Sequence, residues 1–66
     1  MTTKRFAMRL KRLRAERKLS QAAMAEKSGV SREYIARLET GKQDPTLGTL
    51  QKLAKALKVK LPDLLK

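Results

Sequence analysis

The side chains best suited to directional polar contacts lie close together in this 66-residue chain, just after Ser31. Arg32 and Arg37 carry guanidinium groups, and each can donate two hydrogen bonds to atoms O6 and N7 of guanine. Glu33 can accept from a cytosine amino group or hold one of the arginines in place. Tyr34 can touch a thymine methyl group or donate to a phosphate. This set indicates recognition by hydrogen bonding, and its simple alternative is a solvated, charged face of a helix.

The residue types that usually carry catalysis or bind metals are missing. The chain contains no Cys and no His. Disulfides, thiolate ligands and imidazole ligands are therefore excluded, and so are the common nucleophile–base pairs of hydrolases. We expect no enzyme, no metal site and no cofactor.

Positive charge dominates the composition, with 17 Lys and Arg against 6 Asp and Glu, a formal net charge of +11. The field of such a chain selects nucleic acid or an anionic membrane as partner, unless the charge only keeps the surface soluble. The excess is concentrated near the N-terminus, where one acid, Glu16, accompanies eight basic residues: Lys4, Arg5, Arg9, Lys11, Arg12, Arg14, Arg17 and Lys18.

A membrane role is the weaker of these two alternatives. The apolar runs are too short to span a bilayer, and no apolar signal-peptide core follows the basic start, so we expect a cytoplasmic protein, nucleoid-associated if bacterial. A basic helix could still lie on a membrane surface through Phe6, Met8, Leu10 and Leu13. The spacing of Ala25, Gly29 and Ile35 would then have no purpose.

Apolar residues recur at helical spacing, and no strand pattern is present. Three of them at i, i+4 and i+7 predict a first helix over residues 3–17, namely Phe6, Leu10 and Leu13. The hydroxyl groups of Ser20 and Ser31 can accept from free N–H groups, which predicts the starts of a second helix ending near residue 28 and a third ending near residue 40.

The remaining residues predict two further helices. Gly41 is expected as a left-handed cap, and residues 42–45 as a loop. Thr46 can cap a fourth helix, whose apolar set is Leu47, Leu50, Leu53, Ala54 and Leu57. A Pro suits a first helical turn, so a last short helix is expected around residues 62–65. The sequence therefore predicts an all-α fold in a single domain, residues 1–66, with no separate effector-sensing domain.

The second and third helices have the spacing of a helix-turn-helix, over about residues 20–39. A small residue, Ala25, suits the close contact between two short helices. Gly29 suits the sharp turn because it tolerates a positive φ. Ile35 and then Leu38 can anchor the later helix on the earlier one. These features favour a DNA-reading module over an ordinary helical hairpin.

Nearly the whole chain resembles the Cro/C1-type, XRE-like helix-turn-helix regulators, whose fold is that of the lambda-repressor-like DNA-binding domains. The resemblance rests on four blocks in order: Phe6-x3-Leu10-x2-Leu13-Arg14, Leu19-Ser20-Gln21-x2-Met24-Ala25-x3-Gly29-Val30-Ser31, Ile35-x2-Leu38-Glu39-x-Gly41-Lys42, and Pro45-Thr46-Leu47-x2-Leu50-x2-Leu53-Ala54-x2-Leu57-x-Val59. It implies five helices with the third in the major groove of double-stranded DNA.

The same resemblance assigns roles to single residues. It implies base contacts from the third helix, through Arg32, Glu33, Tyr34 and Arg37. It implies phosphate contacts from Gln21, Ser31, Gly41 and Lys42, and the first helix adds Arg9, Arg12 and Lys4 as candidates for the flanking backbone. Arg14 and Glu39 are implied to form a partly buried ion pair that orients the third helix.

Three departures from the family pattern concern helix ends. Ala23 stands where a Glu commonly completes a capping box with Ser20, which weakens that helix start. Lys18 and Lys58 stand where a helix-ending Gly is common, so left-handed caps there would be strained. None of these residues belongs to the expected DNA surface.

Proteins of this kind bind as two-fold dimers to half-sites about one helical turn apart, roughly 34 Å. Leu61, Pro62, Leu64 and Leu65 form the candidate dimer surface, although Leu61 and Leu64 also suit the core. The expected function is a sequence-specific transcriptional regulator on an inverted-repeat operator, touching or blocking polymerase. The alternative is an antitoxin-type regulator that depends on a protein partner such as a toxin. The sequence specifies neither the operator nor the sign of regulation.

Overall fold

The computed structural model describes residues 3–66 and contains five α-helices and no strand over that range. The helices are α1 (Thr3–Glu16), α2 (Gln21–Ser28), α3 (Arg32–Glu39), α4 (Leu47–Leu57) and α5 (Leu61–Leu64). The predicted all-α fold is confirmed, and the predicted helix bounds agree to within about one residue.

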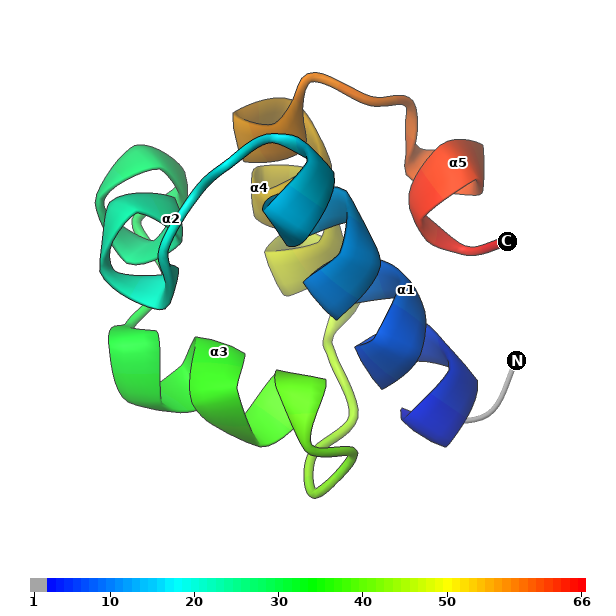
Figure 1. The fold of residues 1–66 in the computed structure, drawn as a ribbon. Coiled ribbons are helices and arrows are strands. Elements are labelled where there is room, and N and C mark those ends of the chain that lie inside the picture. The colour runs from blue at the N-terminus through cyan, green and yellow to red at the C-terminus, as the bar shows by residue number, and fades with distance from the viewer. Residues whose placement is uncertain (1–2) are drawn as a thin grey trace.

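The helices surround one small core. Helix α1 packs on α3 and α5, α2 packs on α3 and α4, and α4 also packs on α5. Figure 1 shows α2 and α3 on one side of the molecule and α5 on the other, with α1 and α4 between them. The helix-turn-helix therefore rests on a scaffold formed by the first and fourth helices.

All five helices contribute to the core. Eight large side chains have less than 2% of their surface exposed: Phe6, Leu10, Met24, Ile35, Leu38, Leu53, Leu57 and Leu64. A domain of this size buries only roughly 60% of its unfolded surface, so each of these contacts matters to stability.

Two apolar residues do not lie where the sequence placed them. Leu64 is completely buried, so the prediction that it faces a dimer partner is wrong, because its side chain fills the space between α5 and the rest of the core. Leu47 is 61% exposed, although it continues the apolar stripe of α4. It occupies the first turn of that helix, beyond the elements that cover Leu50 and Leu53.

The starts of three helices are capped as predicted. Ser20 Oγ accepts from the N–H of Ala23, at 3.0 Å, and Ser31 Oγ accepts from the N–H of Tyr34, at 3.1 Å. Thr46 Oγ1 likewise caps α4. Each cap satisfies one N–H group that a helix cannot pair internally.

Four helix ends use the left-handed region of the backbone. Gly29 and Gly41 adopt it at φ 77° and 75°, and Lys18 and Lys58 adopt it at φ 57° and 58°. The two lysines thus form the left-handed caps whose strain is expected from the sequence. A side chain in this region brings Cβ close to a carbonyl oxygen, so the lysine caps are strained and the glycine caps are not.

Within residues 3–66, no helix combines the length and the apolar character needed to cross a membrane.

Candidate nucleic-acid interface

Helix α3 has one buried face and one polar face. Ile35 and Leu38 are completely buried, and they hold the helix on the core. Arg32, Glu33 and Arg37 are exposed. This division places three hydrogen-bonding side chains on the solvent face of α3, as the sequence predicts.

The guanidinium group of Arg37 is held on two sides. Its Nε donates to Oε1 of Gln43 at 2.7 Å, and its Cζ lies 5.8 Å from the centroid of the Tyr34 ring. A cation over an aromatic ring is attracted by the ring quadrupole. Tyr34 therefore orients Arg37, and the two Nη groups of Arg37 remain for an outside acceptor. Gln43 belongs to the loop after α3, and its contact with Arg37 was not predicted from the sequence.

A buried network fixes α3 against α1 and α2. Arg14 donates from Nε to Oε2 of Glu39 at 2.7 Å and from Nη2 to Oε1 at 3.1 Å. The Arg14 side chain is 16% exposed and that of Glu39 is 3% exposed. Nη1 of Arg14 also donates to the carbonyl oxygen of Leu19, at 2.6 Å. The geometry agrees with the predicted role, a partly buried, two-bonded ion pair that joins the helices.

The hydrogen bonds to Glu39 and the charge of its carboxylate raise the pKa of the Arg14 guanidinium, and burial opposes this only in part. The Arg14 guanidinium therefore keeps its positive charge beside Glu39.

Gln21 belongs to the same network. Its Nε2 donates to Oε1 of Glu39 at 3.1 Å, which joins the start of α2 to the end of α3. Because one amide hydrogen is engaged there, a phosphate would be met by the rest of the Gln21 amide and by the N–H groups at the start of α2.

The loop after α3 lies beside the start of α1. A Cβ built on Gly41 would lie 3.7 Å from the Cα of Lys4. Lys4 and Lys42 are both exposed. Thr3 Oγ1 also donates to the Asp44 carboxylate, which ties the two segments together. The structure thus brings Lys4, Gly41 and Lys42 together, next to the C-terminal end of α3.

Arg9 and Arg12 lie on a different side of α1 from Arg14, and their proposed contacts to the flanking DNA backbone stay a prediction. Arg14 reaches α3, whereas Nε of Arg9 donates to the carbonyl oxygen of Asp63 on α5, at 3.0 Å. Residues five apart on a helix point about 140° apart, so one helix cannot turn both toward α3. Nε of Arg12 pairs with Glu16, at 3.3 Å.

The comparison with known proteins decides the family. Residues 10–64 match the family HTH_3, described as helix-turn-helix. The chain belongs to this family. The resemblance seen in the sequence is thereby confirmed.

Several relatives of this HTH_3 protein are named as regulators. The immunity repressor protein of Bacillus phage phi105 is 43% identical over 53 residues, which are 80% of this chain and 37% of the repressor. The transcriptional repressor RghR of Bacillus subtilis is 47% identical over 55 residues, 82% of this chain and 41% of RghR. The HTH-type transcriptional regulator MJ0272 of Methanocaldococcus jannaschii is 45% identical over 56 residues, 85% of each chain. The chain thus spans less than half the length of two of these relatives.

Two solved structures share the fold. The restriction-modification controller protein C.AhdI from Aeromonas hydrophila has a TM-score of 0.92 and 35% identity, with 94% of each chain covered. An HTH_3 family transcriptional regulator from Vibrio cholerae has a TM-score of 0.92 and 36% identity, covering 97% of this chain and 36% of the other. The names of these proteins favour a transcriptional regulator over an antitoxin-type protein.

Proposed function

We propose that this HTH_3 protein recognises a DNA sequence with α3 in the major groove and regulates transcription from that site. The observation that carries this proposal is that α3 is held firmly on the core while its polar face is exposed to solvent. Its arginines point outward while the Arg14–Glu39 pair and two buried side chains fix the helix on the scaffold. A rigid helix that presents preoriented donors can read base edges without first being ordered.

Base contacts come from Arg32, Glu33 and Arg37 in this proposal. Each well-formed pair of hydrogen bonds between an arginine and guanine discriminates by roughly 1–3 kcal/mol. Tyr34 contributes mainly by holding Arg37, and it can still touch a thymine methyl group at its edge. Two arginines on α3 favour half-sites that contain G·C pairs.

Phosphate contacts flank α3 at both ends. Ser31 and Gln21 lie at the starts of α3 and α2, where free N–H groups and the helix dipole attract an anion. Lys42, Gly41 and Lys4 form the second group, beside the loop after α3. These contacts fix the position of the protein on DNA, and they carry no sequence information.

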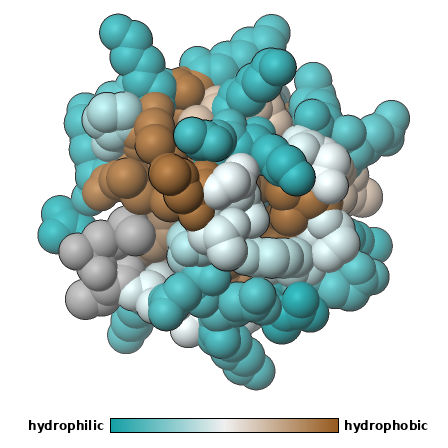
Figure 2. Space-filling model, turned by 180° about the vertical axis from the view of Figure 1, so that it is seen from behind, coloured by the Kyte–Doolittle hydropathy of each residue, from teal (hydrophilic) through white to brown (hydrophobic). Residues whose placement is uncertain are grey.

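The protein acts as a homodimer in this proposal, with an apolar surface on α4 and α5 as the contact. Leu47 and Pro62 are exposed, and Leu61 and Leu65 are half-buried. Figure 2 shows apolar side chains gathered on the side of the molecule where α5 lies. A two-fold dimer would present two α3 helices to an inverted repeat, which one short helix cannot specify alone.

The family is one of regulators, so we propose no catalytic activity, cofactor or metal. The relatives named above come from a phage, from bacteria and from an archaeon. We place the protein in the cytoplasm, on the chromosome of a bacterium or a phage genome.

The test is the selection of bound duplexes from a random DNA pool at physiological salt. We expect enrichment of an inverted repeat whose arms lie about one helical turn apart, roughly 34 Å. Recovery of unbiased DNA would contradict sequence reading by α3. Enrichment of a single, unrepeated half-site would contradict the dimer and would still support sequence recognition by α3.

A further inference from the structure

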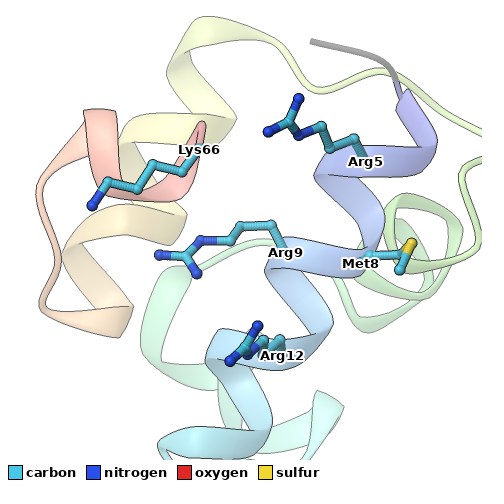
Figure 3. A pocket seen from close by; sticks show the side chains of 5 residues that line it. All are labelled: Arg5, Met8, Arg9, Arg12 and Lys66. Carbon is cyan, nitrogen blue, oxygen red and sulfur yellow. The ribbon is translucent and has the colours of Figure 1, made fainter.

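A hollow of about 410 Å³ lies where α1 passes α5 (Figure 3). Its lining consists of Arg5, Met8, Arg9, Arg12 and Lys66. The three arginines leave α1 on the side of α5, and Met8 borders the hollow on the side away from α5 (Figure 3). The wall is mainly carbon, as expected where long cationic side chains contribute their aliphatic stems.

The hollow keeps an excess of positive charge. Glu16 lies 3.3 Å from Nε of Arg12, and the Asp63 carboxylate lies 3.5 Å from Nζ of Lys66. Both ion pairs are exposed, with the Arg12 side chain 73% exposed, so water and salt weaken them. Arg9 donates to a carbonyl oxygen and not to a carboxylate, so its charge is not neutralised. The hollow is therefore positively charged, since the pairs of Arg12 and Lys66 are exposed.

The helix dipole does not favour the cations at the start of α1. The first turn of α1 contains Lys4 and Arg5 and no acid. The N-terminal end of a helix carries partial positive charge, so cations there disfavour the helix. By contrast, Arg9 and Arg12 have contacts within the fold, to Asp63 and to Glu16.

A second hollow with lysines provides a comparison. Lys27, Lys52, Lys55 and Lys58 line it, between α2 and α4. Lys27 and Lys55 lie in the last turns of their helices, and Lys58 caps α4. Cations at these positions stabilise a helix dipole, so these lysines have a role within the fold.

Residue types favour a protein as the partner at the first hollow. Arg and Met are enriched in protein interfaces and Lys is depleted, and Arg is frequent among the residues that dominate binding energy. Met8 is 66% exposed, and its flexible thioether side chain adapts to different apolar surfaces. A phosphate backbone would make no use of an exposed methionine.

A second copy of this chain does not fit the hollow. The chain has six acidic residues, no two of them closer than five positions apart. It therefore offers no acidic segment to a cluster of cations, and two symmetry-related hollows would repel each other. The spacing of the acids in these 66 residues therefore favours another protein as the source of the complementary charge.

We propose that the α1–α5 hollow docks an acidic segment of a partner protein, with carboxylates at the arginines and Lys66 and an apolar side chain on Met8. The hollow lies on the flank of α1 opposite to Arg14 and α3. The partner can therefore bind while α3 remains open to DNA. This inference does not rest on the proposed DNA recognition.

The probe is a short fluorescent peptide in which Asp and Glu alternate with Leu, measured by anisotropy at physiological salt. Two control peptides replace the acids by Asn and Gln, or Leu by Ser. The protein variants are Arg12→Glu and Met8→Asn, both at exposed positions, and thermal melts check that they fold. Lys55→Glu in the second hollow is the matched control, because it makes the same change of charge.

We expect the acidic peptide to bind the natural chain, and Arg12→Glu to weaken it about tenfold or more, since an attractive charge becomes a repulsive one. The affinity should fall several-fold when Met8 is replaced by Asn or when the peptide carries Ser in place of Leu. The neutral peptide should not bind. Lys55→Glu should keep its affinity for the acidic peptide within about twofold of that of the natural chain.

Three results would overturn the proposal. The acidic peptide could fail to bind, or Lys55→Glu could weaken it as much as Arg12→Glu does, which would show attraction by net charge alone. A random-sequence DNA duplex could also lose far more affinity in Arg12→Glu than in Lys55→Glu, which would make the hollow a second DNA surface.

Discussion

At the scale of single residues, Glu39 holds α3 against α1 and α2. Its carboxylate accepts from Arg14 and from Gln21, and its side chain is only 3% exposed. A buried acceptor that loses its charge leaves Arg14 without a counter-ion, in a place where water cannot replace it. Loss of the Glu39 charge should therefore lower the free energy of unfolding of the whole domain.

Replacing Glu39 by Gln tests this directly. Removing one partner of a buried pair costs on the order of 3–5 kcal/mol, and roughly 3 is expected here because Gln keeps some hydrogen bonds. In a domain this small, each kcal/mol lowers Tm by about 4–8 °C. Glu16→Gln is the control in a thermal melt, since its pair with Arg12 is exposed and contributes less than about 1 kcal/mol. Equal Tm values for the two variants would contradict the structural role of Glu39.

Arg37 depends on a residue that the sequence did not single out. Because Gln43 holds Nε and Tyr34 lies against the guanidinium group, only the Nη groups are left for DNA. If Arg37 contacts a base as proposed, Gln43 is a positioning residue for that contact. The bond spans six positions and depends on the path of the loop, which no local pattern in the sequence specifies.

Base-preference profiles separate these roles. Arg37→Ala should remove the preference at one base position, by roughly 1–3 kcal/mol, and Gln43→Ala should weaken the preference at that same position by less. Lys42→Ala should lower the affinity for all sequences alike, because it removes a phosphate contact. A Gln43→Ala profile that matched the uniform loss of Lys42→Ala would assign Gln43 to the phosphates instead.

At the scale of helices, the C-terminal ends of α1, α3 and α4 differ in strain and not in hydrogen bonding. After α1, the N–H of Leu19 bonds the carbonyl of Arg14, and after α4 the N–H of Val59 bonds that of Ala54. The same bond closes α3, from Lys42 to Arg37. In each case one left-handed residue turns the chain, and only the α3 end has the glycine that suits it.

Lys58→Gly should therefore stabilise the protein. Relief of the left-handed strain gives about 1 kcal/mol, reduced by the greater freedom of glycine in the unfolded chain. Lys55→Gly, three residues earlier inside α4, should destabilise it by about 1 kcal/mol. Denaturant melts of both variants check the opposite signs. A loss of stability in both would show that Lys58 contributes through its charge near the helix end.

Helix positions could be predicted from the sequence because their signals are local. Caps such as Ser20, Ser31 and Thr46, together with apolar periodicity, specify where a helix begins and which face is buried. Contacts between distant elements could not be predicted in the same way. Arg9 meets α5 54 residues along the chain, and Leu64 meets the core, because short helices pack by shape that periodicity does not describe.

At the scale of the whole molecule, the candidate phosphate contacts and the proposed subunit contact have separate places. The candidate phosphate contacts lie beside α2 and α3, whereas the apolar side chains gather on the side of α5 (Figure 2). In the proposed arrangement, DNA and a second subunit would therefore bind at the same time. Dimerisation would then double the number of neutralised phosphates, which determines how steeply affinity falls with salt.

Leu47→Asp should make the DNA affinity depend less steeply on salt concentration. If the dimer neutralises six to ten phosphates, its DNA affinity falls roughly 10³- to 10⁵-fold between 50 and 200 mM salt. The aspartate places a charge in the proposed dimer contact, and Leu47 is already 61% exposed, so the monomer should remain folded. The monomer would neutralise half as many phosphates, and its log–log slope should be about half as steep.

Met8→Asp is the control for that slope, since Met8 is 66% exposed and the charge change is the same. Sedimentation measures the oligomeric state of each variant, and binding to the selected operator at several salt concentrations gives the slopes. Met8→Asp should stay dimeric and keep the steep slope. If Leu47→Asp stayed dimeric and kept an unchanged slope, the subunit contact would not lie at the start of α4. An aspartate buried at the two-fold axis would face the same aspartate of the other subunit, and the two charges would repel each other.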